Sequence, residues 1–173
     1  LKMLVNKKNH MKTGSNGIKL IKSFESLHDG DLTQIGLQPK MCPAGIWTEG
    51  YGRAMRDKKG NFIKGKENWR LAFSSATINT EAEAEKALLQ DLKVYEAIVE
   101  RKISVALTQN QFDALVSHTY NTGGSGTLFK LINDNSKKES IKFWVENKYT
   151  TANGVELKGL VRRRKAEAEL FFK

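Results

Sequence analysis

The chain has 173 residues, with 29 lysines and arginines against 19 aspartates and glutamates, and a formal net charge of +10. This length suits one domain with a substantial core, and 39% hydrophobic and 28% charged residues are typical of a globular rather than a disordered chain. A single cysteine excludes an internal disulfide, and the three histidines lie too far apart to form a ligand motif. We therefore expect no metal site and no cofactor.

The positive charge favours an anionic partner. Nucleic acid, an anionic membrane face and an acidic wall polymer all fit at this stage. No apolar stretch reaches the length of a membrane span, and the lysine-rich N-terminus lacks the features of a signal peptide. We therefore expect no stable membrane anchor, and we treat residues 1–12 as an N-terminal extension, disordered and outside the fold.

Hydrophobic periodicity predicts a helix over residues 17–27, where apolar side chains recur every three or four positions. Glycines and both prolines then gather in residues 28–79, which predicts a small lobe with short strands at 45–48 and 61–64. A turn is predicted at 57–61.

The rest of the chain is predicted to be helical. Thr80 and Glu83 form a capping-box pattern at the start of a long helix that reaches about Lys102 and can connect two lobes. A second capping box, Thr108 to Gln111, begins a helical lobe over 103–173. Shorter periodic runs in this lobe predict further helices around 128–132, 141–145 and 160–172. The predicted fold class is α+β, with residues 13–173 as a single domain.

Two side chains are candidates for chemistry. Glu25 falls at the predicted end of the first helix, where the negative end of the macrodipole favours the protonated carboxyl that a general acid needs; the plain alternative is a surface glutamate. Cys42 precedes Pro43, which favours an extended backbone and an accessible thiol at a loop, although a lone cysteine is more often a small buried apolar residue.

Two motifs argue against nucleotide or nucleic-acid binding. Gly50 and Gly52 begin a glycine-rich motif, but Met55 occupies the place of the third glycine of a dinucleotide fingerprint. The basic cluster 162–165 lies at a helix start, where the dipole disfavours cations, so at least one arginine should have a specific anionic partner. Aromatic residues do not interleave with this cluster, as readers of single strands require.

Four ordered segments together resemble the phage-type lysozymes, glycoside hydrolase family 24. Phe24-Glu25 and the segment 43–52 (PAGIWTEGYG) resemble the family's glutamate and its AGxxTxGYG strand. The segment 107–117 (LTQNQFDALVS) is similar to its LTxxQFDALVS helix, and Tyr120-Asn121-Thr122-Gly123 to the FNxG continuation. The segment 159–167 (GLVRRRKAE) is similar to its GLxxRRxxE signature.

The resemblance implies a two-lobed lysozyme fold and a muramidase that cleaves the β-1,4 bond between N-acetylmuramic acid and N-acetylglucosamine, in a cleft between the lobes. Glu25 matches the family's acid and Thr48 its threonine, and Cys42 stands in the usual aspartate position. Arg53 stands where a histidine often follows the strand, and residues 28–41 contain an insertion relative to the family. The implied substrate-binding residues are Gly52, Tyr120, Asn121, Arg162 and Arg163, with one of the two arginines as a partner of Glu25 or of a substrate carboxylate.

The resemblance leaves the course of the reaction open. Attack by Cys42 would retain configuration, whereas a water held by Thr48 and Cys42 would invert it. The alternative function is a catalytically weak peptidoglycan-binding module, because the aspartate is replaced; a basic nucleic-acid binder is a third hypothesis. We expect a monomer that acts on bacterial peptidoglycan, binds no nucleic acid and waits in the host cytoplasm until its release to the cell wall.

Overall fold

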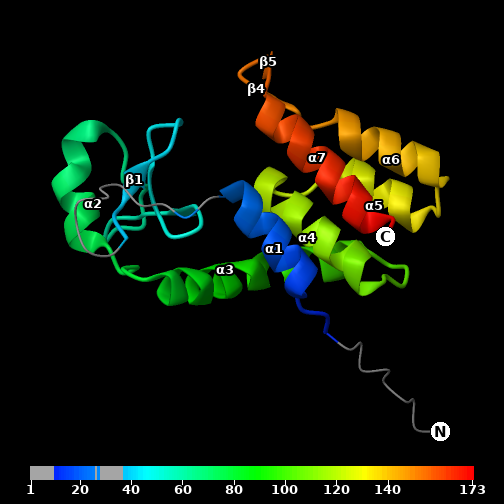
Figure 1. Cartoon of the computed structure of the whole chain (residues 1–173), viewed down its shortest axis with the longest axis horizontal. Helices are drawn as coiled ribbons and strands as arrows, with labels where there is room; N and C mark the ends of the chain where they lie inside the picture. The colour runs from blue at the N-terminus through cyan, green and yellow to red at the C-terminus, as the bar shows by residue number, and fades with distance from the viewer. Residues whose placement is uncertain (1–9, 26, 28–36) are drawn as a thin grey trace, which may run out of the picture. The chain divides into compact units, whose positions relative to one another are not determined.

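The computed structural model describes residues 10–25, 27 and 37–173. It contains helices and short antiparallel strands, which confirms the α+β class (Figure 1). The backbone divides into two compact units. The smaller unit is Ile21–Leu92, and the larger unit joins the residues up to Leu20 to Lys93–Lys173. The divisions fall inside helices α1 (Ser15–Glu25) and α3 (Glu81–Lys102).

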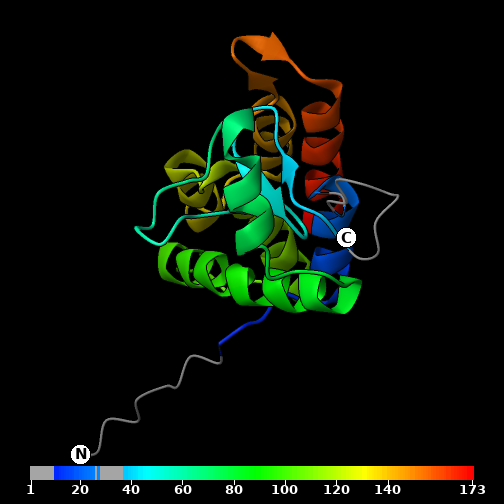
Figure 2. The ribbon, with the colours of Figure 1, turned by 90° about the vertical axis from the view of Figure 1, so that its left-hand side faces the viewer.

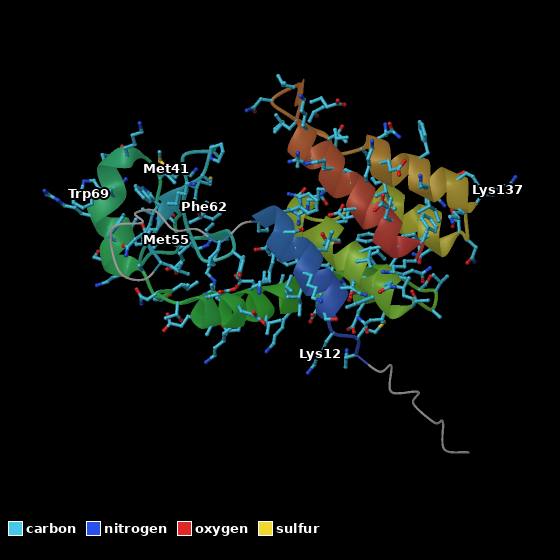
Figure 3. The ribbon with its side chains drawn as sticks, viewed as in Figure 1. Lys12, Met41, Met55, Phe62, Trp69 and Lys137 are labelled. Carbon is cyan, nitrogen blue, oxygen red and sulfur yellow. The ribbon has the colours of Figure 1, made fainter. Side chains whose placement is uncertain are left out.

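The smaller unit is built on a three-stranded antiparallel sheet in the order β1-β2-β3. Its strands are β1 (Lys40–Met41), β2 (Trp47–Glu49) and β3 (Arg53–Ala54). A 3-10 turn, Lys66–Asn68, then leads into helix α2 (Trp69–Ser75). One sheet face and α2 enclose a core of Trp47, Met55, Ile63 and Ala72, against which Met41 and Phe73 pack; Figure 3 labels Met41 and Met55 at this place.

Four helices and a hairpin form the larger unit, together with the start of α1, up to Leu20, and the end of α3, from Lys93. They are α4 (Gln109–Thr122), α5 (Gly126–Asn133), α6 (Lys138–Asn147), the hairpin β4 (Thr151–Ala152) with β5 (Val155–Glu156), and α7 (Lys158–Phe171). Helix α4 lies along α7, and α6 packs on α7 (Figure 1). Every residue of α4 from Phe112 to Thr119 is buried, as expected of a central helix that has no solvent face there.

The predicted helix starts agree closely with the structure. The Thr108 hydroxyl accepts from the Gln111 amide at 3.2 Å and the Gln111 side chain accepts from the Thr108 amide at 2.9 Å, a complete capping box. At α3 the Glu83 amide donates to the Thr80 hydroxyl at 3.2 Å, but the Glu83 carboxylate accepts from the amide of Asn79 at 2.7 Å, one residue earlier than predicted.

Helix α1 begins two residues before the predicted start, and a buried residue of α4 fixes its position. Asp113 is 1% exposed, and its carboxylate accepts from the amides of Gly14 at 2.8 Å and Gly17 at 3.0 Å. A Cβ atom at Gly17 would lie within 2.9 Å of Asp113, so only glycine allows this approach. An aspartate at a helix N-terminus satisfies orphan amides and the dipole together, so Asp113 on α4 caps the start of α1.

Several short elements were not predicted from the sequence, among them β1, β3, helix α2 and the hairpin β4–β5. Helix α2 lies inside the segment assigned to strands and turns, because seven residues are too short for a clear helical period. The hairpin β4–β5 turns at Asn153 and Gly154, both with positive φ, and it extends beyond the start of α7 (Figure 2). An Asn-Gly pair is the strongest sequence signal for such a turn, and it could have predicted the hairpin.

Residues 1–9 of the predicted extension and most of the predicted insertion, 28–36, lie outside the described residues. His10 and Met11 are described, and both bind the carboxylate of Glu100 on α3, at 2.8 Å and 2.7 Å. Within the described ranges, no helix is long and apolar enough to cross a membrane.

Candidate active site

Glu25 is the last residue of α1, and its side chain is half-buried against the turn that follows β2. This turn contains Gly52, whose φ is +84°, and a Cβ atom there would lie 3.0 Å from Oε2 of Glu25. Glycine is needed at this point twice, for the left-handed backbone and for the space that the carboxylate occupies. Glu25 and the glycine motif, which the family resemblance quoted as separate segments, are thus in contact.

The turn that contacts Glu25 is bound to α3 by the two residues that flank Gly52. Arg53 donates to both carboxylate oxygens of Asp91 at 2.9 Å, and to the carbonyl oxygen of Ala87 at 3.0 Å. The hydroxyl of Tyr51 donates to Glu81 at 3.3 Å. A bidentate arginine–carboxylate pair is rigid as well as strong, so it fixes the backbone on which the Glu25 carboxylate rests. This pair gives Arg53, the departure from the family pattern, a positioning role.

Thr48 and Cys42 lie on the neighbouring hairpin. Residues 42–45 form its turn, in which the Cys42 amide donates to the carbonyl oxygen of Ile46 and the Cys42 carbonyl oxygen accepts from the amide of Gly45, each at 2.8 Å. Lys40 is opposite Thr48 and Met41 is opposite Trp47. Since side chains alternate along a strand, Cys42 and Thr48 share the sheet face opposite the Trp47 core.

The hydroxyl of Thr48 has a defined orientation. Thr48 is 6% exposed, and its Oγ1 donates to the carbonyl oxygen of Lys40 at 2.9 Å. Its single proton is thus used within the hairpin, and only its lone pairs remain to accept a hydrogen bond. Cys42 is a half-buried free thiol at the end of the same hairpin.

Sequence reasoning missed the buried carboxylate of Glu49, next to Thr48 on β2. Glu49 is 5% exposed and accepts from the amides of Thr77 and Ile78 at 2.9 Å and 3.2 Å, and from the Thr77 hydroxyl at 3.0 Å. These bonds tie β2 to the segment that enters α3. The only sequence signal is a charged residue directly after Trp47 and Thr48 and before the glycine motif.

The other predicted site residues belong to the larger unit. Tyr120, near the end of α4, contacts Tyr95 edge-on with ring centroids 5.0 Å apart. Oδ1 of the exposed Asn121 accepts from Nη2 of Arg164 at 2.7 Å. Arg164 therefore sets the orientation of the Asn121 amide and leaves its NH₂ group to donate.

The arginine cluster has the anionic partner that its placement predicted. Arg163 and Arg164 are buried, and their guanidiniums bracket the carboxylate of Glu167 at 3.1 Å and 3.0 Å. The Ser117 hydroxyl also donates to Glu167, at 2.8 Å. Burial raises the pKa of Glu167 above its ordinary value, and the two guanidiniums oppose this rise. Arg162, by contrast, is exposed.

His118 lies beside this cluster, between the rings of Trp144 and Tyr149. Burial, and then the charges of Arg164 and Arg163, lower the pKa of His118 to about 3, so the imidazole is neutral near pH 7.

The structure brings Glu25 and Gly52 together and carries Cys42 and Thr48 on the adjoining hairpin, all within the smaller unit. Tyr120, Asn121, Arg162 and Arg163 lie in the larger unit, so the pairing of Glu25 with an arginine stays a prediction. Among the described residues, no three histidine, cysteine, aspartate or glutamate side chains form a group that could hold a metal ion.

The small antiparallel sheet and the helical unit agree with the lysozyme-like fold of the solved structures that this chain resembles. The chain is 29% identical to the muramidase domain of SpmX from Asticaccaulis excentricus, with a TM-score of 0.70 over 94% of this chain and 98% of that one. It is 30% identical to the endolysin of Acyrthosiphon pisum secondary endosymbiont phage 1, over 93% of this chain and 98% of the relative. It is 32% identical to the endolysin of Bacillus phage B103 over 93% of this chain, but spans only 54% of that relative.

The phage lysozyme family model matches residues 32–167, and the chain belongs to this family. The matched range begins after Glu25, so the family model does not test Glu25 as the acid.

Proposed function

We propose that this protein is a muramidase, which hydrolyses the β-1,4 bond between N-acetylmuramic acid and N-acetylglucosamine in bacterial peptidoglycan. The observation that carries the proposal is the seating of Glu25 on Gly52, beside the hairpin of Thr48 and Cys42. The family membership and the endolysin relatives support a substrate in the cell wall. The protein is proposed to act as a monomer without a cofactor, and to wait in the host cytoplasm until its release to the wall.

Glu25 is the proposed general acid. Its protonated carboxyl gives a proton to the departing glycosidic oxygen while positive charge develops at the anomeric carbon. Because Gly52 has no side chain to shield the backbone of this turn, a sugar could approach that backbone beside the Glu25 carboxylate. Gly52 is therefore proposed to contact substrate as well as to seat the acid.

Thr48 and Cys42 are proposed to act on the opposite side of the bond. The Thr48 hydroxyl, with its proton donated to Lys40, can accept a hydrogen bond from a water and so orient one of that water's lone pairs. In an inverting reaction this water attacks the anomeric carbon and the Cys42 thiolate accepts its proton. In a retaining reaction the thiolate attacks directly, and water later hydrolyses the glycosyl–sulfur bond while Glu25 takes the proton.

The larger unit is proposed to supply the remaining substrate contacts. The NH₂ group of Asn121, oriented through Arg164, suits a sugar carbonyl or hydroxyl oxygen. Tyr120 offers a half-buried ring, and the exposed Arg162 suits a substrate carboxylate. Arg163 is buried and already pairs with Glu167, whereas Arg162 is exposed. Of the two proposed arginines, Arg162 is therefore the more accessible to substrate.

The second candidate function is a catalytically weak peptidoglycan-binding module. The observation that favours it is Cys42 itself, because a thiol replaces the carboxylate that the family uses opposite its acid.

A pair of variants tests both candidates on purified peptidoglycan. Glu25→Gln should abolish the loss of turbidity, and Cys42→Ala should reduce it clearly but less. Glu67→Gln, at an exposed glutamate of the same unit that forms no ion pair with the described residues, serves as the matched control and should keep wild-type activity. Cleavage by Glu25→Gln at the wild-type rate would refute the assignment, and wild-type cleavage by Cys42→Ala would reduce Cys42 to a packing residue. Wall binding without any cleavage by the unmodified protein would support the binding module.

A further inference from the structure

A strongly cationic hairpin lies in the smaller unit, outside the proposed catalytic residues. Residues 56–66, here called the cationic hairpin, carry one acid, Asp57, and five cations: Arg56, Lys58, Lys59, Lys64 and Lys66. All five cations are exposed, and none forms an ion pair with any described residue. Cations elsewhere, such as Lys22 and Arg53, do pair with carboxylates.

The acidic residues in and beside the hairpin do not cancel this charge. Asp57 accepts from the backbone amides of Lys59 and Asn61, each at 2.9 Å, and these bonds hold the pKa of its carboxyl below the usual range. Its carboxylate thus closes the turn and makes the hairpin rigid. Glu67, directly after the hairpin, lies against Gly65 and leaves a large positive excess.

An exposed aromatic ring stands among these cations. Phe62 is 39% exposed, and the Arg56 guanidinium lies 3.9 Å from its ring centroid and the Lys64 ammonium 5.9 Å from it. Arg56 is held in place because its Nη1 donates to the carbonyl oxygen of Gly60 at 2.8 Å. Figure 3 labels Phe62 beside the strands, apart from Trp69 on α2. An exposed apolar ring with fixed positive charges beside it suits a ligand that has both an apolar surface, such as a sugar face or a methyl group, and an anionic group.

Strand pairing connects this hairpin to the face that carries Thr48. Lys64 is the bridge partner of Ile46, and Phe62 is the partner of Arg56. Ile63, between them, points into the Trp47 core and is 2% exposed. Because partners in antiparallel pairs point to the same side, and residues two apart do too, Phe62, Lys64, Ile46 and Thr48 lie on the side away from the Trp47 core.

We propose that the cationic hairpin binds the free carboxylates of the peptides attached to the glycan that the enzyme cleaves. This inference rests on the proposed function, and it assigns to the hairpin a holding role separate from catalysis. A glycan that lies along the Thr48 face would continue past Phe62, and its charged peptides would meet the lysines. Exposed, unpaired charges raise the local concentration of an anionic polymer, and salt weakens their effect.

Binding to insoluble peptidoglycan tests the proposal in the Glu25→Gln background, where cleavage does not disturb the measurement. Lys58→Glu/Lys59→Glu reverses two exposed charges at the turn without removing a described side-chain contact. Lys86→Glu/Lys93→Glu, on the exposed side of α3, makes the same change in net charge and is the matched control. The hairpin variant should lose about tenfold or more in affinity for polymer-free sacculi in low salt, and the loss should shrink as salt rises. The control should stay within about twofold.

A second experiment removes the charge of the peptide carboxylates by chemical amidation. On amidated sacculi, the hairpin variant and the control should bind equally weakly. In the catalytically competent background, the hairpin variant should cleave short, peptide-free glycan fragments as the wild type does. This outcome separates a failure of the hairpin from a failure of the muramidase assignment.

Three results would overturn the proposal. They are equal binding of both variants to native sacculi, a loss confined to walls that still carry phosphodiester polymers, and a preference of the hairpin for duplex DNA over sacculi.

Discussion

Each unit of the molecule buries a carboxylate beside residues of the proposed site, and the two are stabilised differently. In the smaller unit, Glu49 is bound by two backbone amides and a hydroxyl, with no cation among these partners. In the larger unit, Glu167 is bound by two buried guanidiniums and a hydroxyl. The first arrangement positions backbone, whereas the second balances charge and orients Asn121 through Arg164. The two units should therefore respond differently to the loss of one negative charge.

The largest expected effect follows from removing the charge of Glu167. Glu167→Gln leaves Arg163 and Arg164 buried without an anion, and breaking a buried pair in this way typically costs about 3–5 kcal/mol. Chemical denaturation should report that loss, and Ser117→Ala, which removes only a hydroxyl from the same carboxylate, should cost much less. Equal losses for the two variants would show that charge balance does not dominate this cluster.

The helical unit should also be the acid-sensitive one, because of His118. Its pKa is about 3 in the folded state against an ordinary 6.5, so between these values the unfolded chain binds a proton that the folded chain does not. His118 therefore lowers the free energy of unfolding by about 1.4 kcal/mol per pH unit as pH falls from 6.5 towards 3.

Denaturation of His118→Gln across this pH range measures that slope. The variant should lose most of the dependence, whereas His10→Gln, at the exposed His10, should keep it. An unchanged slope in His118→Gln would mean that other groups govern acid unfolding.

A smaller effect is expected at Glu49. Glu49→Gln keeps one acceptor oxygen for the amides of Thr77 and Ile78 but turns an NH₂ group towards the remaining donors, at a cost of about 1–3 kcal/mol. Thr77→Val, which removes a single hydroxyl, is the matched comparison. A loss as large as that of Glu167→Gln would end the distinction between the two carboxylates.

Local patterns predicted much of the fold and part of the site. The capping residues Thr80 and Thr108 placed two helix starts because a cap depends on residues three positions apart. Glu25 and Gly52 could each be named as site residues because each belongs to a recognisable motif, but their contact was not predicted. The turn at 57–61 was predicted from its Asp, Gly and Asn residues, and Asp57 does close it.

Contacts between distant segments could not be predicted from one sequence. Asp113 caps a helix 96 residues earlier, and Arg53 binds Asp91 38 residues later. A glutamate in a short strand is normally expected to be exposed. Glu49 is buried because Thr77 and Ile78, which lie far along the chain, pass beside β2 and bind its carboxylate. Sequence reasoning did not name Glu167, one helical turn away, as the carboxylate that pairs with Arg163 and Arg164.

The products released from peptidoglycan test the central claim most directly. Purified sacculi would be digested, the new reducing ends reduced with borohydride, and the fragments identified by mass spectrometry. Hydrolysis of the proposed bond with Glu25 as the acid predicts reduced N-acetylmuramic acid at the new ends with the wild-type protein, and none with Glu25→Gln. Reduced N-acetylglucosamine, non-reducing anhydro ends, or the same products from both proteins would contradict the account.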